Sequence, residues 1–231
     1  MAKALLRRSK DRKVAVLLTN SGNSAIANTF GLPAGLDFSC PSATSVCGKV
    51  CYAGKIEKRY VDTHNMLNAN FELLKSASMS GMVELLDDMI TEFSNECNRR
   101  NAPKLFRIHW DGDFFSAEYT KAWKRVIDKH ADVQFWVYTR VVASAVMLKG
   151  MNNLSLYFST DSENKAQGEI LAKSGIKLAY LAETFADGRA DMGRGIPCPE
   201  NNGKLPMQGA CVSCGQCVFE RNDILFSIKK R

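Results

Sequence analysis

The chain has 231 residues, of which 45% are hydrophobic and 24% are charged, and these values are average for a globular protein. This length suffices for one α/β domain with a short appendage. No apolar run approaches the ~18 residues that a membrane span needs, and the basic start MAKALLRRSKDRK has no apolar stretch behind it, so it does not resemble a secretory signal. We therefore expect a cytoplasmic protein without membrane contact.

The formal charge of +7 is concentrated at the two ends of the chain. Residues 1–13 carry six basic side chains and one acid, and residues 229–231 add three positive charges, so the rest of the chain carries −1. Basic ends can be attracted to phosphate backbones. Short charged termini are more often only solvated, so nucleic-acid contact through them is compatible with the sequence but is not favoured.

The first predicted element is a short buried strand over 13–20 (KVAVLLTN). A loop follows, TFGLPAGLDFSCPSATSVCGKVCYAG, which contains the first three cysteines. Residues 62–100 then predict two helices, because their apolar residues recur at spacings of three and four. Cys97 continues the second apolar stripe, so we expect it to be a packed core thiol.

The second half alternates short apolar runs with helical segments, which implies a parallel sheet. Counted with the N-terminal strand, these runs predict a partial or complete parallel β/α (TIM-like) barrel over residues 1–187. After Asp187 the chain is rich in Gly, Pro and Asn, and it predicts a Cys-rich C-terminal metal-binding segment, 188–231, packed on the barrel. The predicted strands are 104–110, 133–138, 154–159 and 176–181, and the predicted helices are 116–130, 142–149 and 163–174.

Polar residues follow each of the four predicted strands. In parallel β/α folds the functional residues gather in the loops at the carboxyl ends of the strands. Four such endings favour a shared pocket that binds a cofactor. The residues expected to line this pocket are Asp111, Asp113, Thr139, Arg140, Ser159, Asp161 and Glu183.

Two residues on the run 104–110 need a separate interpretation. Arg107 and His109 alternate with Ile108, so both side chains should lean to the same side of the strand. If that side faces the barrel interior, both belong to the pocket. Otherwise Arg107 pairs with a carboxylate and His109 is a partly buried histidine with its hydrogen bonds satisfied.

The rear cysteines carry the strongest signal for metal. Cys211, Cys214 and Cys217 form a Cys-x-x-Cys-x-x-Cys run, and Cys198 precedes them by twelve intervening residues. In a reducing compartment such thiols persist as metal ligands rather than as disulfides. Four soft thiolates suit a tetrahedral zinc ion or an iron–sulfur cluster, and the triplet spacing resembles that of bacterial ferredoxins, which favours a 4Fe–4S cluster over zinc.

The front cysteines, Cys40, Cys47 and Cys51, supply only three ligands. Three thiolates on a 4Fe–4S cube leave one iron open for an exogenous ligand, much as catalytic zinc sites keep an open position. Alternatively, front and rear cysteines meet in space and share one site. The sequence is compatible with one cluster or with two.

Nearly the whole chain resembles the bacteriophage gene product 88 family. The segments that carry this resemblance are NTFGLPAG, CPSATSVCGKVCYAG, FRIHWDGDFFSAEYTKAW, FWVYTR and CVSCGQC. The name of the family implies an origin in a bacteriophage, and hence the cytoplasm of a host cell. It implies almost nothing about biochemistry.

A more distant resemblance is to radical S-adenosylmethionine enzymes. That family implies a partial β/α barrel in which Cys40, Cys47 and Cys51 are similar to the cysteine loop, and the Asp111-Gly112-Asp113 turn is similar to the turn that binds the amino group of the methionine moiety. Ser159 and Asp161 are similar to a later polar pair, and the rear cysteines to an auxiliary cluster. The chain departs from the family pattern in its cysteine spacing of six and then three residues, and in the position of its acidic turn.

Two functions follow as hypotheses. The first is a phage-type 4Fe–4S protein on a radical-S-adenosylmethionine-like barrel, with redox or radical activity on an unknown substrate and S-adenosylmethionine as a candidate cofactor. The second is a non-catalytic protein that binds zinc or an iron–sulfur cluster and interacts with a host or phage macromolecule.

Overall fold

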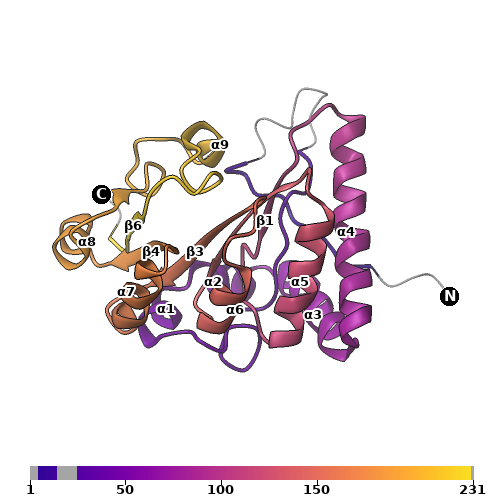
Figure 1. The fold of residues 1–231 in the computed structure, drawn as a ribbon, viewed down its shortest axis with the longest axis horizontal. Helices are drawn as coiled ribbons and strands as arrows, with labels where there is room; N and C mark the ends of the chain where they lie inside the picture. The colour runs from indigo at the N-terminus through magenta and orange to yellow at the C-terminus, as the bar shows by residue number, and fades with distance from the viewer. Residues whose placement is uncertain (1–4, 15–24, 230–231) are drawn as a thin grey trace.

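The computed structural model describes residues 5–14 and 25–229 (Figure 1). Six parallel strands form one sheet in this part of the chain, in the order β1-β2-β3-β4-β6-β5. The strands are β1 (Leu105–Ile108), β2 (Gln134–Thr139), β3 (Leu154–Thr160), β4 (Lys177–Ala182), β5 (Ile196–Pro197) and β6 (Ile224–Ser227).

The parallel α/β class predicted from the sequence is confirmed. Strand β1 lies within its predicted apolar run, and β2, β3 and β4 each extend one residue past the end of theirs. The predicted first strand, 13–20, lies outside the described residues except for Lys13 and Val14. Beyond β1, Thr29 forms a parallel bridge with Arg107, and Ser9 forms an antiparallel bridge with Thr29. Closure into a TIM-like barrel stays a prediction.

Side chains on the strands alternate between two apolar environments, as the period of two in a strand requires. On β2, Phe135 and Val137 belong to the large core beneath the helices. Trp136 packs on the opposite face with Val14 and Val218 from the two ends of the chain. Both faces of the sheet are therefore covered, which is typical of parallel sheets.

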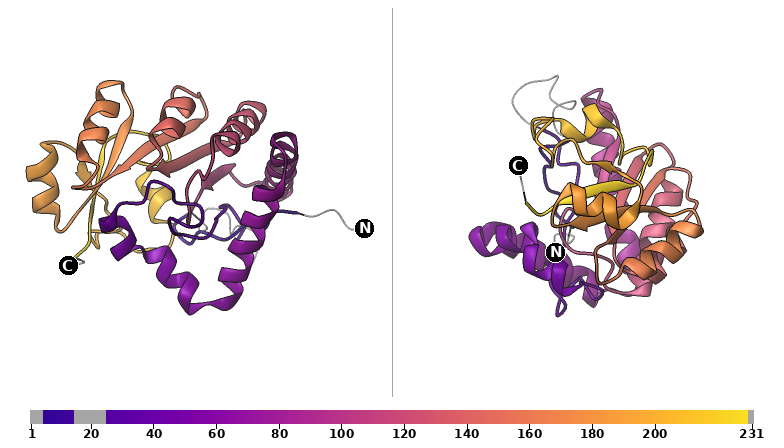
Figure 2. Two further views of the ribbon diagram at one scale, coloured as in Figure 1. Left: turned by 90° about the horizontal axis from the view of Figure 1, so that it is seen from below. Right: turned by 90° about the vertical axis from the view of Figure 1, so that its left-hand side faces the viewer.

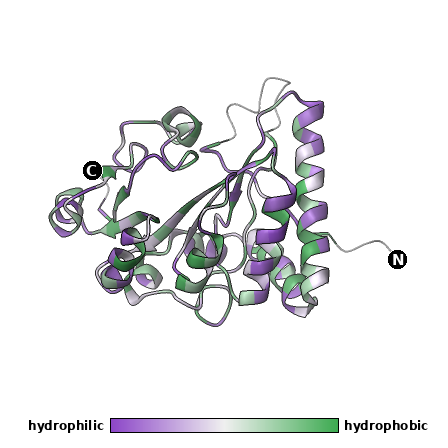
Figure 3. Cartoon of the chain, in the orientation of Figure 1, coloured by the Kyte–Doolittle hydropathy of each residue, from purple (hydrophilic) through white to green (hydrophobic). Residues whose placement is uncertain are grey.

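One layer of helices covers the face of the sheet on which Phe135 and Val137 lie. Figure 2 shows these helices in an arc outside the strands. In Figure 3, α4 and α5 carry apolar and polar stripes along their length, which explains why spacing alone predicted them. The helices of this layer are α4 (Met79–Arg99), α5 (Ala117–Lys129), α6 (Val142–Leu148), α7 (Lys165–Lys173) and α8 (Phe185–Met192).

The cysteine-bearing segments contain shorter helices that the sequence did not predict. They are α1 (Ser45–Val50), α2 (Tyr52–Arg59) and α9 (Ala210–Cys214), and α2 leads into the longer helix α3 (Val61–Ser76). Helices of five to eight residues span too few turns for a clear apolar period. None of the described helices is both long enough and apolar enough to span a lipid bilayer.

The residues after Asp187 contribute part of helix α8, both strands β5 and β6, and helix α9. Strand β6 pairs with β4 on one side and with β5 on the other. The C-terminal segment is thus hydrogen-bonded into the main sheet. Its treatment as a separate unit from residue 188 stays a prediction.

Candidate metal and cofactor site

The rear cysteines lie against the sheet face opposite the helical layer. Cys211 and Cys217 pack on the cluster that contains Trp136, and Cys198 and Cys217 pack on the cluster that contains Tyr157. All four rear thiols are free and half-buried. Because Cys217 contacts both apolar clusters, the part of the chain around Cys198 and the part around Cys211 meet at Cys217.

Cys217 is the centre of the rear group. It packs with Cys211 on the Trp136 cluster and with Cys198 on the Tyr157 cluster, and Cys214 lies nearby. Gly215 ends helix α9 in a left-handed conformation with φ 68°, which turns the chain between Cys214 and Cys217. The Cys-x-x-Cys-x-x-Cys run thus folds back on itself, and its three thiols share one region with Cys198.

Hydrogen bonds from the sheet hold the rear segment in place. The Tyr157 hydroxyl lies 3.0 Å from both the Gln216 and Asn222 carbonyl oxygens, and the Ser155 hydroxyl donates to the Val218 carbonyl at 2.7 Å. These contacts satisfy backbone acceptors on both sides of Cys217. The position of this loop therefore depends on sheet side chains as well as on its own turns.

Burial raises the pKa of Cys211 to about 12 and that of Cys217 to about 11. Two neighbours oppose this rise. Arg107 lies close enough to Cys211 to favour its thiolate, and the Tyr138 hydroxyl lies close enough to Cys217 to favour the thiolate there. The thiols of Cys211 and Cys217 are nevertheless neutral at pH 7, and their ionisation needs a further positive charge, which a bound metal would supply.

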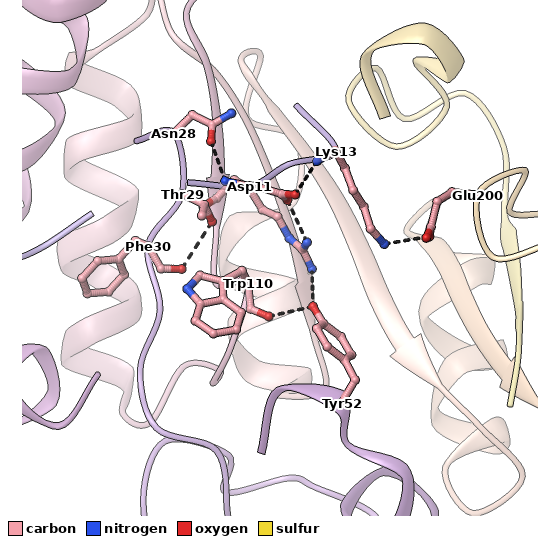
Figure 4. A network of polar contacts seen from close by, with 9 residues as sticks. Asp11, Lys13, Asn28, Thr29, Phe30, Tyr52, Trp110 and Glu200 are labelled. Atoms are coloured by element: carbon pink, nitrogen blue, oxygen red, sulfur yellow. Dashed lines mark hydrogen bonds and ion pairs between the residues drawn. The ribbon is translucent and has the colours of Figure 1, made fainter. Parts of the chain in front are cut away.

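Arg107 lies between the rear cysteines and the front loop. Its guanidinium forms an ion pair of 3.1 Å with Asp11, lies over the Tyr138 ring at 5.6 Å, and makes a long 3.5 Å contact with the Tyr52 hydroxyl. Figure 4 shows the surrounding network, in which the Tyr52 hydroxyl also donates to the Trp110 carbonyl at 3.0 Å. Arg107 thus connects the N-terminal segment with the residue that follows Cys51.

A second link joins the N-terminal segment to the rear group. The Lys13 ammonium and the Glu200 carboxylate are 2.7 Å apart, as Figure 4 shows. Nearby, the Cys211 amide donates to the Lys13 carbonyl at 3.1 Å and the Gly209 amide to the Arg12 carbonyl at 3.0 Å. The two ends of the chain therefore assemble the rear group together.

The front cysteines occupy the loop and helices that precede α3. The Cys47 amide donates to the Thr44 hydroxyl at 3.0 Å, and the Cys51 sulfur accepts from the Gly54 amide at 3.3 Å at the start of α2. Cys51 and Cys47 interact electrostatically. Burial raises the pKa of Cys40 to about 12, and nearby Asp113 and Asp111 also raise it.

The front loop is tied to the carboxyl ends of the strands by residues that the sequence had placed in a pocket. The Thr44 hydroxyl donates to Asp161 at 2.6 Å, and Arg140 forms an ion pair with the same Asp161 oxygen at 2.7 Å. Asp113 accepts from the Thr139 hydroxyl at 2.6 Å and from the Arg140 amide at 2.8 Å. The structure therefore brings these side chains together with the loop, and their hydrogen bonds are made to one another.

Asp111 differs from its neighbours. Its Oδ1 accepts from the Gly112 amide at 2.8 Å, whereas its buried Oδ2 has no hydrogen-bond donor among the described residues. Burial, together with the adjacent Glu57 carboxylate, raises the pKa of Asp111 to about 9. It also interacts electrostatically with Cys40 and Cys51. Of the predicted pocket residues, Asp111 is thus a neutral carboxyl group at pH 7 that lies beside Cys40 and Cys51.

Ser159 and Glu183 are placed differently from the other predicted pocket residues. Ser159 lies within β3, half-buried, and its carbonyl accepts from the Asn164 side chain at 3.1 Å. The Glu183 side chain is 54% exposed and pairs with Lys229 at 3.3 Å. Glu183 follows β4, next to the C-terminal strand, and its recorded contacts are with that strand and not with the front loop.

Arg107 and His109 do not share a side of the strand as the alternation predicted. Strand β1 ends at Ile108, and His109 adopts a left-handed φ of 58°, which turns its ring into the helical core. There it contacts Phe114 and hydrogen-bonds the Tyr119 hydroxyl at 2.9 Å. His109 is thus a buried core histidine, and Cys97 is likewise fully buried in that core.

Three functional candidates emerge only from the structure. Tyr138 lies beside Cys217, Glu57 lies beside Asp111, and Tyr52 directly follows Cys51 and binds the Trp110 carbonyl. The position of Tyr52 directly after Cys51 was the one available signal. Within the described residues, no three His, Cys, Asp or Glu side chains are arranged to hold a single metal ion.

Comparison with known proteins agrees with the resemblance to a bacteriophage family. The family model described as "Gene product 88" matches residues 4–220. Two relatives, each named "Gene 88 protein", are 49% identical in Mycobacterium phage L5 and 48% identical in Mycobacterium phage D29. Each match covers 99% of this chain and 100% of the relative. No solved structure matches, and the resemblance to radical S-adenosylmethionine enzymes finds no support in these comparisons.

Proposed function

Because the chain belongs to the gene product 88 family, whose name specifies no chemistry, we propose from its own residues that it is an iron–sulfur protein. Cys198, Cys211, Cys214 and Cys217 would hold one 4Fe–4S cluster against the sheet. The observation that carries this proposal is the position of Cys217, which packs with Cys211 on one apolar cluster and with Cys198 on the other, while Cys214 lies nearby.

A cluster explains the rear group better than a single zinc ion does. Structural zinc sites typically use thiolates in separate Cys-x-x-Cys pairs. Three cysteines that are each two residues apart, as Cys211, Cys214 and Cys217 are, are instead typical of a 4Fe–4S cluster. Its surroundings would be an arginine, a tyrosine hydroxyl and apolar side chains, the features that tune cluster potentials.

The front cysteines are the candidate second centre. Cys40 and Cys51 lie near Asp111, Cys47 lies near Cys51, and three thiolates would leave one iron of a cluster open to another ligand. This arrangement favours an enzyme as the second candidate function, with a bound small molecule such as S-adenosylmethionine at the open position. The alternative for the whole chain is a non-catalytic metal protein that presents a surface to a host or phage partner.

Iron and acid-labile sulfide counts on protein purified without oxygen test the proposal. About four irons per chain indicate one cluster and about eight indicate two, since each cube contains four irons. Cys214→Ser should remove the rear cluster, whereas Cys97→Ala is the matched control because Cys97 is buried in the helical core. Colourless protein that contains zinc, or full iron content in Cys214→Ser, would contradict the proposed ligands.

The front site is tested separately. Cys47→Ser should lower a count of about eight irons to about four and leave the rear cluster intact. With dithionite as the electron donor, release of 5′-deoxyadenosine from S-adenosylmethionine would support the enzyme function. An intact front cluster that gives no product would support the non-catalytic alternative. Under either hypothesis the chain would act in the reducing cytoplasm of the host cell, where thiols persist as metal ligands.

A further inference from the structure

The surface of helix α2 is strongly basic and is not used by the proposed iron–sulfur sites. Between Lys49 and Tyr60 the chain carries four cations, Lys49, Lys55, Lys58 and Arg59, and all four are exposed. None of them forms an ion pair in the part of the chain that the structure describes. The single acid of this segment, Glu57, is buried beneath the helix.

The helical period gathers the charges on one face. At 100° per residue, Tyr52, Lys55, Lys58 and Arg59 fall within about 120° of the helix circumference. Ala53 and Glu57 lie on the opposite, buried side. The helix dipole favours cations in the last turn, where Lys58 and Arg59 lie. Lys49 lies likewise in the last turn of α1, but the dipole gives no reason for Lys55, so the helix dipole alone does not explain the basic face.

Two exposed tyrosines flank these cations. Tyr52 is 54% exposed and Tyr60 is 52% exposed, and the Arg59 guanidinium lies 5.6 Å from the centre of the Tyr60 ring. The Tyr52 hydroxyl is anchored to the Trp110 carbonyl, which fixes the orientation of its ring while leaving the ring accessible. Rings held at the surface among cations are suited to stack with planar groups of a polyanion.

The Arg107 network brings a second basic segment to the same region. Arg107 contacts both Tyr52 and Asp11, so the neighbours of Asp11 in the chain lie near the start of α2 (Figure 4). Lys10 and Arg12 flank Asp11, and both are exposed. The positive surface therefore combines two segments that are about 40 residues apart in sequence.

We propose that this face, the α2 surface, binds single-stranded nucleic acid, with phosphates on the cations and bases stacked on Tyr60 and Tyr52. Single-strand binding proteins combine a positive track for the backbone with aromatic rings that stack on bases. The two exposed tyrosine rings favour a nucleic acid, whose bases can stack on them. A membrane would instead need a continuous apolar face beside the cations. The inference does not depend on the metal content of the protein.

Fluorescence anisotropy of a labelled 15-mer tests the proposal on the full chain, with DNA and RNA single strands in separate arms. The charge variant is Lys55→Gln/Lys58→Gln/Arg59→Gln. The matched control, Lys121→Gln/Arg125→Gln/Lys149→Gln, removes three exposed cations from the helical layer. The charge variant should lower the slope of log affinity against log salt by about 2, since each phosphate contact contributes about 0.7. The control should leave the slope unchanged.

Tyr60→Ala tests stacking and should weaken binding about tenfold, whereas Tyr60→Phe should restore it because the ring is retained. Unfolding midpoints equal to that of the wild type show that the variants are folded. No binding of either single strand, an equal loss in the charge variant and its control, or tighter binding to anionic vesicles than to single strands would each overturn the proposal. Equal affinity for an abasic polyphosphate and for the 15-mer would also overturn the proposal, because the bases would then contribute nothing to binding.

Discussion

Arg140 and Asp161 form an ion pair of 2.7 Å whose side chains are 9% and 0% exposed. The same Asp161 oxygen accepts the Thr44 hydroxyl at 2.6 Å, so this pair connects strands β2 and β3 to the loop of the front cysteines. Asp161 Oδ1 accepts the Glu163 amide at 2.9 Å. A residue expected to bind a cofactor thus has a structural role that positions the cysteine loop.

Asp161→Asn should destabilise the protein by about 3–5 kcal/mol, because removal of one partner leaves the Arg140 charge buried and uncompensated. Urea unfolding measures the loss. The matched control is Asp128→Asn, which removes an ion pair with Lys124 on exposed side chains and should cost at most about 0.5 kcal/mol. Equal losses in the two variants would mean that the Arg140 pair has no special structural role.

Gly112→Ala should prevent close packing of the front loop. Gly112 has φ 79°, and an added Cβ would lie 2.9 Å from the Leu32 carbonyl oxygen and in collision with the Ser39 hydroxyl. The control, Gly150→Ala, has nearly the same φ of 80° and open space around its Cβ. Both variants should lose about 1–2 kcal/mol from the left-handed backbone, and Gly112→Ala a further 1–3 kcal/mol, about the cost of overpacking. Thermal and urea unfolding compare them.

His109 should make the protein less stable in acid. Burial, with a smaller effect of the Arg107 charge, lowers the pKa of His109 to about 3. Between the ordinary value of about 6.5 and this value, the unfolded chain binds a proton that the folded chain does not. The stability contributed by His109 is therefore complete above pH ~6.5 and is lost as the pH falls toward about 3.

The test is His109→Gln, which retains a polar group for the Tyr119 hydroxyl but does not titrate. Its free energy of unfolding should be lower than that of the wild type at pH 7, and the gap should narrow as the pH falls. Parallel curves for the two proteins from pH 7 to pH 4 would contradict the buried neutral histidine.

Tyr138→Phe should change the electronic properties of the proposed rear cluster. The Tyr138 hydroxyl lies close enough to the Cys217 thiol to lower its pKa, and a hydroxyl group beside a cluster sulfur stabilises the reduced, more negative form of the cluster. The variant should therefore have a more negative midpoint potential. Tyr180→Phe is the control, since the Tyr180 hydroxyl binds Asp191 at 2.7 Å in the helical layer. A redox titration followed by visible absorption distinguishes them, and an equal potential in both would place the cluster elsewhere.

The sequence predicted the elements whose pattern repeats over several turns or alternations. Helices α4 and α5 and strands β2 and β3 were predicted because each carries enough apolar residues to define a period. Helices α1 and α9 were not predicted, since they have only six and five residues, too few to show an apolar period.

The sequence predicted which residues lie at the candidate site more reliably than it predicted what those residues do there. Asp113 and Asp161 do lie at strand ends beside the cysteine loop, as the rule for parallel sheets requires. Sequence could not reveal that their oxygens are occupied by Thr139, Arg140 and Thr44, because those partners come from distant segments. The side chain of His109 was predicted on the wrong side of β1. His109 itself adopts a left-handed conformation at the end of this strand, which turns its side chain to the side opposite the one that strict alternation predicts.

The sheet order has a consequence for how the chain is made. Strand β6 is the last strand in sequence, yet it lies inside the sheet, between β4 and β5. During synthesis β5 has no neighbour to pair with until Ile224–Ser227 leaves the ribosome. Cys198, which follows β5, therefore takes its place beside the other rear cysteines only after β6 has formed, so the assembly of the rear group depends on the pairing of β6 with β4 and β5.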